Sequence, residues 1–167
     1  MRRFAVLLAL LCVSTAAAGS AAAAPSARAA TTPLGWVEKI DRDGGTRITF
    51  RIVSLERAAG GWRLRVEIEN RGTGPLAIAP MNWGIAEFAS ERSFDKPVRV
   101  FPARAITPRP PEMLAAGRTW KGVVSGRGAP DDEKWVRAVM GLFATRTTPT
   151  PFSWITDNAL HGFTFAI

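Results

Sequence analysis

An unbroken alternation of apolar and charged residues over 62–69 (WRLRVEIE) limits the possible folds of this chain more than any other feature. Successive side chains of a strand point to opposite faces, so this pattern predicts a strand with one buried and one solvated face. Residues 47–57 alternate in the same way, with Ile48, Phe50 and Ile52 on one side. A short connection containing Gly60 and Gly61 separates the two segments. We therefore predict an antiparallel hairpin of residues 47–57 and 62–70.

Further short strands are expected along the rest of the chain, at residues 76–78, 82–88, 98–101, 119–124 and 163–167. Residues 106–111 (ITPRPP) are expected to form an extended surface connection, because proline has no amide hydrogen to donate within a sheet. Residues 131–143 fit either a helix that begins at Asp131 or a short turn followed by a strand, and we favour the strand. About seven short strands with frequent turn signals predict an all-β fold, an immunoglobulin-like antiparallel β-sandwich over residues 47–167.

The N-terminal segment has the pattern of a secretory signal peptide. Arg2 and Arg3 precede an apolar run, and Ala27-Arg28-Ala29 supplies a small-residue cleavage motif. Cleavage after Ala18 is an alternative. The apolar run is too short to span a bilayer comfortably, which takes roughly 20 residues. We expect residues 1–29 to be removed, the mature protein to be exported to the periplasm, cell envelope or exterior, and residues 30–46 to form a linker or loosely docked arm.

Removal of this segment changes the charge and the cysteine content. Lys and Arg fall from 22 to 19 while all 14 acidic residues stay, which leaves a net charge of +5. Cys12 is the only cysteine and leaves with the signal peptide. The mature chain therefore has no disulfide, and its stability must come from packing in a single core. No second long apolar stretch follows, so we expect no membrane span after cleavage.

The alternation and turn described above resemble a known group of domains. The residues concerned are Gly61-Trp62-x-Leu64-x-Val66-x-Ile68-x-Asn70-x-Gly72-x-x-Pro75. They are similar to the second strand and turn of small secreted bacterial immunoglobulin-like domains. Leu114-x-x-Gly117, Thr119-Trp120-x-Gly122 and Trp135-Val136-Arg137 resemble their second half. The resemblance implies a sandwich fold outside the bacterial membrane, and it supplies no catalytic residue.

Residue types that carry chemistry are scarce in this chain. His161 is the only histidine, and no Gly-x-Ser-x-Gly motif surrounds a serine, so a secreted hydrolase is the least favoured hypothesis. Glu67 and Glu69 share a strand face with Arg63 and Arg65, which favours ion pairing over acid–base catalysis. The acidic run at 131–133 and the Asp41/Asp43 pair lack the spacing of a calcium loop. We expect no catalytic residue, no metal and no cofactor.

Binding is the remaining function class, and tryptophans are the candidate residues. Basic residues are scattered along an exported chain, which argues against nucleic acid. Trp83 and Trp154 lie in irregular segments, where an exposed indole could anchor a partner protein or stack on a sugar ring. We expect a non-enzymatic, monomeric domain that binds an unidentified protein or envelope component. The alternative is a carbohydrate- or cell-wall-binding module, which requires Trp83 and Trp154 to be exposed on one surface.

Overall fold

The computed structural model describes residues 30–42, 44–58, 60–93, 96–128, 130, 134–146 and 151–161. These residues form ten strands and no helix, so the fold is all-β as predicted, but the expected number of about seven strands is too low. The strands are β1 (Ala30–Arg42), β2 (Thr46–Ala58), β3 (Gly61–Asn70), β4 (Leu76–Ile78), β5 (Gly84–Phe88), β6 (Arg99–Thr107), β7 (Met113–Leu114), β8 (Thr119–Arg127), β9 (Trp135–Ala144) and β10 (Phe152–Ile155).

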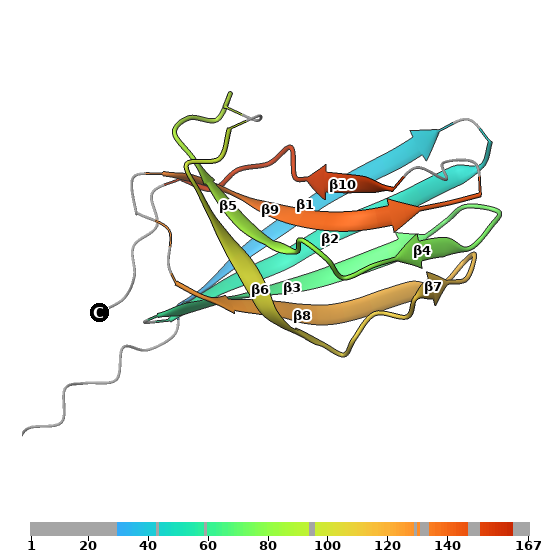
Figure 1. Ribbon diagram of the computed structural model, residues 1–167, viewed down its shortest axis with the longest axis horizontal. Helices are drawn as coiled ribbons and strands as arrows, with labels where there is room; N and C mark the ends of the chain where they lie inside the picture. The colour runs from blue at the N-terminus through green and yellow to red at the C-terminus, as the bar shows by residue number, and fades with distance from the viewer. Residues whose placement is uncertain are drawn as a thin grey trace, which may run out of the picture.

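The strands pair antiparallel in one continuous sheet that folds over into two layers, an open β-sandwich (Figure 1). One layer has the order β1-β2-β3-β8, and the other contains β5, β9, β4 and β7, with β10 paired to β9. In Figure 1, β9, β5 and β4 cross in front of β1, β2 and β3. Aromatic contacts join the layers, since Phe50 of β2 packs edge-on against Phe143 of β9 at 5.1 Å between ring centroids.

The predicted hairpin is confirmed in β2 and β3, which pair from Ile48↔Asn70 to Ala58↔Gly61. The apolar residues of the alternation all point inward, and Phe50, Ile52, Val66 and Ile68 are completely buried. A bulge at Val53 shifts the register between Ile52 and Ser54. The buried face of β2 is formed by even-numbered residues up to Ile52, and because of this shift it continues at Leu55.

The segment 30–46, expected to be a linker or arm, is mostly a strand. β1 pairs with β2 over its whole length, from Ala30↔Arg57 to Arg42↔Thr46. The inward face of β1 packs against the core through Leu34, Trp36 and Ile40. Pro33 and Gly35, which suggested a linker, lie at a register shift of this edge strand. An edge strand tolerates such residues because only one of its sides needs hydrogen-bonding partners.

The C-terminal part of the chain also differs from the expectation. Residues 134–144 contain no helix, and β9 confirms the favoured strand. β10 was not predicted, and it extends the second layer along β9. The expected strand at 163–167 and the acidic run at 131–133 lie outside the described residues.

β6 carries the sheet from one layer to the other. Its first half pairs with β5, from Arg99↔Glu87 to Pro102↔Gly84, and its second half pairs with β8, beginning at Ala103↔Gly126. Both partners at this crossing are glycines. A Cβ on Gly84 would collide with the Phe101 carbonyl oxygen, and one on Gly126 would lie 2.6 Å from the Pro102 carbonyl oxygen. The missing side chains therefore allow β6 to approach both neighbours closely.

We predict that Gly84→Ala lowers the free energy of unfolding by about 1–3 kcal/mol, because backbone rather than a flexible side chain must move aside. Gly74→Ala is the matched control, since nothing lies within 4 Å of a Cβ at that position. Chemical denaturation of both variants measures the difference. Equal stability of the two variants would show that β6 does not depend on this close approach.

Candidate functional site

Both tryptophans selected from the sequence lie in the core. Trp83 is 2% exposed and packs edge-on against Trp120, with ring centroids 5.6 Å apart. Trp154 is 7% exposed and stacks on Phe50 at 4.3 Å. The expectation of two exposed indoles is therefore wrong, and no indole face at these positions is available to a sugar ring. Their irregular sequence context reflects the break between β4 and β5 and the short edge strand β10.

Trp154 instead takes part in a polar contact between the two layers. Glu38 is on the inward face of β1, and its carboxylate accepts hydrogen bonds from the Trp154 indole N–H and the Asp157 backbone N–H. Burial raises the pKa of the Glu38 carboxyl, although these hydrogen bonds act in the opposite direction, and the nearby Asp157 carboxylate raises it further. This inward charge links the edge strand β1 to the segment that follows β10.

A groove lies beside the second half of β6, on the side away from β8. We call it the β6 groove; it has a volume of about 340 Å³ and is lined by Pro80, Asn82, Trp83, Pro102, Ala103, Arg104, Ala105, Ile106 and Arg109. One wall comes from β6 and the other from the irregular segment between β4 and β5. A single backbone hydrogen bond, from Ala103 N–H to the Trp83 carbonyl at 2.7 Å, joins the two walls. The size is in the range of small ligand sites.

The β6 groove is basic and partly apolar. Arg104 and Arg109 are exposed, and in the part of the chain that the structure describes they form no ion pair and no acidic residue lines the groove. The Trp83 indole N–H is buried without a hydrogen-bond partner in the part of the chain that the structure describes. Trp83 thus lines the groove without offering a stacking platform. Two exposed guanidinium groups that no described carboxylate neutralises suit a negatively charged ligand.

An exposed apolar row leads along β6 to the groove. Val98 and Val100 are 58% and 50% exposed, and Pro102 follows on the same face because side chains alternate along a strand. Met81, between two groove-lining residues, is 58% exposed. Isolated apolar residues on a surface are ordinary, but a row that continues into a groove is typical of an interaction site.

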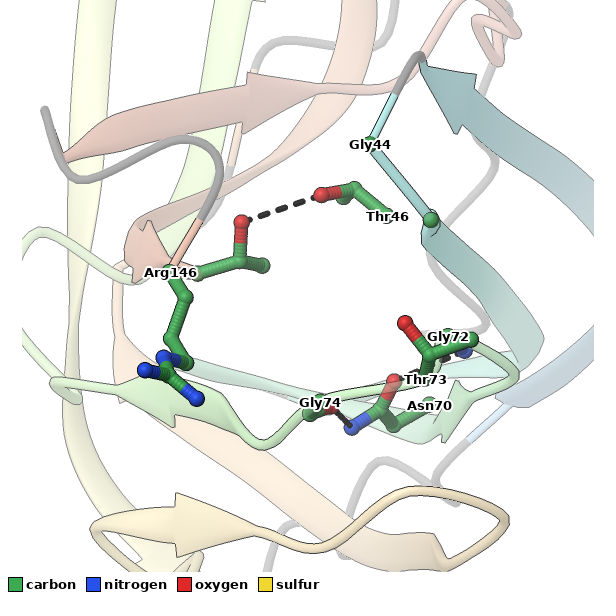
Figure 2. A pocket seen from close by; sticks show the side chains of 9 residues that line it. Gly44, Thr46, Asn70, Gly72, Thr73, Gly74 and Arg146 are labelled. Carbon is green, nitrogen blue, oxygen red and sulfur yellow. Dashed lines mark hydrogen bonds between the residues drawn. The ribbon is translucent and has the colours of Figure 1, made fainter.

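A second pocket, of about 300 Å³, lies where the β1–β2 and β3–β4 turns meet the end of β9 (Figure 2). Its polar groups are used within the turns themselves. The Asn70 side chain donates to the Gly74 and Leu114 carbonyls, both at 2.9 Å, and accepts from Gly72 N–H at 3.0 Å. Thr46 and Thr145 join their hydroxyls at 3.0 Å. This pocket has a structural explanation and offers weaker evidence for a ligand.

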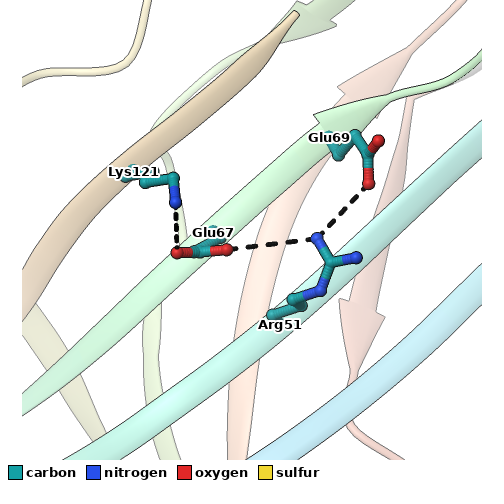
Figure 3. A network of polar contacts seen from close by, with 4 residues as sticks. All are labelled: Arg51, Glu67, Glu69 and Lys121. Carbon is teal, nitrogen blue, oxygen red and sulfur yellow. Dashed lines mark hydrogen bonds and ion pairs between the residues drawn. The ribbon is translucent and has the colours of Figure 1, made fainter.

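The outward face of the first layer carries the predicted cross-strand ion pairs (Figure 3). Arg51 lies between Glu67 and Glu69, at 4.0 and 3.3 Å, and Lys121 contacts Glu67 at 2.8 Å. The two carboxylates are therefore held by cations on neighbouring strands, as expected for a solvated sheet face. Such exposed pairs each contribute about 0–1 kcal/mol to stability.

The second layer buries two charges that sequence patterns did not single out. Glu87 is 1% exposed and pairs with Arg99 at 2.9 Å. Arg137 is fully buried, donates to the Glu91 carbonyl and lies over the Phe88 ring. Burial lowers the pKa of the Arg137 guanidinium. These contacts tie β5, β6 and β9 to the segment after β5, so their role is structural.

The remaining candidates for chemistry do not come together. The His161 ring stacks on that of Trp135 at 4.9 Å, a packing role beside the Val136↔Leu160 bridge. Asp41 pairs with Arg47 at 3.3 Å, and Asp43 lies outside the described residues. No group of three or more metal-ligating side chains occurs in the described ranges. Within those same ranges, no helix is long and apolar enough to cross a membrane.

The sequence matches no protein-family model and no curated protein.

We predict that Glu38→Ala lowers stability by about 1–3 kcal/mol, because the buried Trp154 indole N–H loses its acceptor. Glu38→Gln keeps an acceptor without the charge. The raised pKa means that the folded state holds the Glu38 proton more tightly than the unfolded state. The contribution of Glu38 to folding stability is therefore fully present at pH values below the pKa that its carboxyl has in the unfolded chain. That contribution is lost as the pH rises through the higher pKa of the folded protein.

Unfolding of wild type and Glu38→Gln between pH 4 and 7 measures this effect. We expect wild type to lose stability relative to Glu38→Gln as the pH rises. A constant difference across that range would contradict the buried position of the carboxylate.

Proposed function

We propose that the chain is exported and that, after removal of residues 1–29, it acts as a non-enzymatic immunoglobulin-like domain that binds a protein or envelope partner. Export is supported by the basic start, apolar run and Ala-Arg-Ala motif of the N-terminal sequence. The immunoglobulin-like assignment is supported by the two-layer antiparallel sandwich and by the residues that resemble secreted domains of that type.

One observation carries the binding function. Val98, Val100 and Pro102 form an exposed apolar row that runs into the β6 groove, where Arg104 and Arg109 are unpaired among the described residues. A monomer gains nothing in stability from an apolar row in water, whereas a partner that covers it removes that area from solvent. The cationic groove next to it supplies charge complementarity for orienting the partner. The carbohydrate-binding alternative needed two exposed indoles, and it is not carried further.

Export is tested with the full 167-residue chain produced in a bacterial host. We expect the exported fraction to contain a protein whose mass corresponds to cleavage after Ala29, or after Ala18 if the earlier motif is used. Mass spectrometry of that fraction gives the answer. Retention of the uncleaved chain inside the cell would contradict export.

Binding is tested with the purified mature chain and a washed envelope fraction. We expect saturable binding that is reduced about tenfold or more by Val100→Glu, because the variant places a charge where apolar contact is needed. Val37→Glu is the matched control, since Val37 is 46% exposed on β1 in the other layer. Equal loss in both variants, or no saturable binding by wild type, would contradict a specific binding surface on β6. Far-ultraviolet circular dichroism confirms that both variants are folded.

A further inference from the structure

The side of β6 that faces the groove is an open strand edge. Ala103 and residues 105–107 pair with β8 on one side, with Arg104 left unpaired at a β-bulge, and no strand of the described chain pairs with Arg104–Thr107 on the other. An open edge presents backbone donors and acceptors that a second strand can satisfy.

The lining of the groove shows that it follows this edge. Five consecutive residues, 102–106, line the same cavity. A β-bulge at Arg104 interrupts the alternation of side chains, yet the lining includes the half-buried Ala103 and Ile106 as well as the exposed Arg104 and Ala105, so the cavity is not confined to one face of the strand. A cavity that contacts five in a row lies along the strand edge, where backbone atoms are within reach of a ligand.

The residues before and after the open edge of β6 limit the length of a strand that could pair with it. The Ala103 N–H already donates to the Trp83 carbonyl and Pro108 has no amide hydrogen to donate, so the usable edge extends over residues 104–107. Four residues of strand cover about 13 Å. The edge is therefore suited to a short extended segment rather than to another sheet.

The charges that line the groove indicate which side chains the bound segment should carry. Arg104 is within the usable edge and Arg109 lies just beyond it, and among the described residues no acidic side chain lines the groove to neutralise either one. Guanidinium groups bind carboxylates in a paired, directional geometry.

We infer that the β6 groove binds an extended acidic peptide segment of about four residues, which adds as a strand to the open edge of β6 and places carboxylates against Arg104 and Arg109. This inference rests on the proposed function and specifies the partner of that same surface. The segment belongs to a protein, because backbone pairing needs amide groups that a sugar polymer or a nucleic acid does not supply in this form.

The experiment uses the mature chain and three capped peptides. They are acetyl-Val-Glu-Val-Glu-Val-amide, the same peptide with Gln in place of Glu, and a Glu peptide in which alternate amide nitrogens are methylated. We expect the Glu peptide to bind at least about tenfold more tightly than either of the others. Hydrogen exchange should slow at the backbone amides of Arg104–Thr107 when the Glu peptide is bound.

Variants locate the site. The double variant Arg104→Gln, Arg109→Gln should lose at least about tenfold in affinity for the Glu peptide. The control Arg71→Gln, Arg118→Gln, which removes the same charge from two exposed residues in turns, should bind like wild type. Thermal unfolding confirms that both variants are folded.

Three results would overturn the inference. These are equal affinity of the Glu and Gln peptides, tight binding by the methylated peptide, or equal loss in the groove and control variants. Competition by inorganic polyphosphate as effective as the Glu peptide would show a general anion site and would also overturn it. Envelope binding that is sensitive to Val100→Glu would still support the proposed function, so the two failures are distinguishable.

Discussion

The crossing of β6 from one layer to the other is the constraint on which this sandwich depends. The strand satisfies its backbone first with β5 and then with β8, and both partner residues at the crossing are glycines. A side chain at Gly84 or Gly126 would meet β6 backbone, so the two layers would not be linked by hydrogen bonds as they are here. The β6 groove exists because the strand leaves the second layer at this point and its edge is then unpaired on one side.

The opposite side of the sandwich is linked by a side chain rather than by backbone pairing. Glu38 reaches from β1 to Trp154 and to the backbone after β10. Its inward position also discourages strand addition along β1, because an incoming strand would have to accommodate a half-buried charge. The β1 edge and the open part of the β6 edge thus differ in chemistry: β1 has an inward carboxylate, while β6 has a cationic, partly apolar groove, and both strands carry a bulge. This difference is why we assign the binding role to β6.

Charge has separate roles on the two layers. On the outward face of the first layer, Arg51 and Lys121 pair with Glu67 and Glu69, so these four charges offset one another. In the second layer, Arg99 and Glu87 are paired, and Arg137 contacts the Glu91 carbonyl. Arg104 and Arg109 stand apart from these contacts, since neither forms an ion pair with a described residue. The groove therefore presents two guanidinium groups that no described carboxylate neutralises.

The sequence by itself determined the strand class and the buried face of the central hairpin. Alternation is a local property, and the burial of Val66 and Ile68 follows from it whatever the partner strands are. The sequence did not reveal β1, because a strand tolerates Pro33 and Gly35 only at the edge of a sheet. Whether a strand lies at an edge is decided by the assembled sheet, and the sequence alone does not show it. It also placed Trp83 and Trp154 on the surface, although both fill the core. Only the tertiary structure brought Trp83, Arg104 and Arg109 to one groove, because that meeting depends on where β6 crosses between the layers.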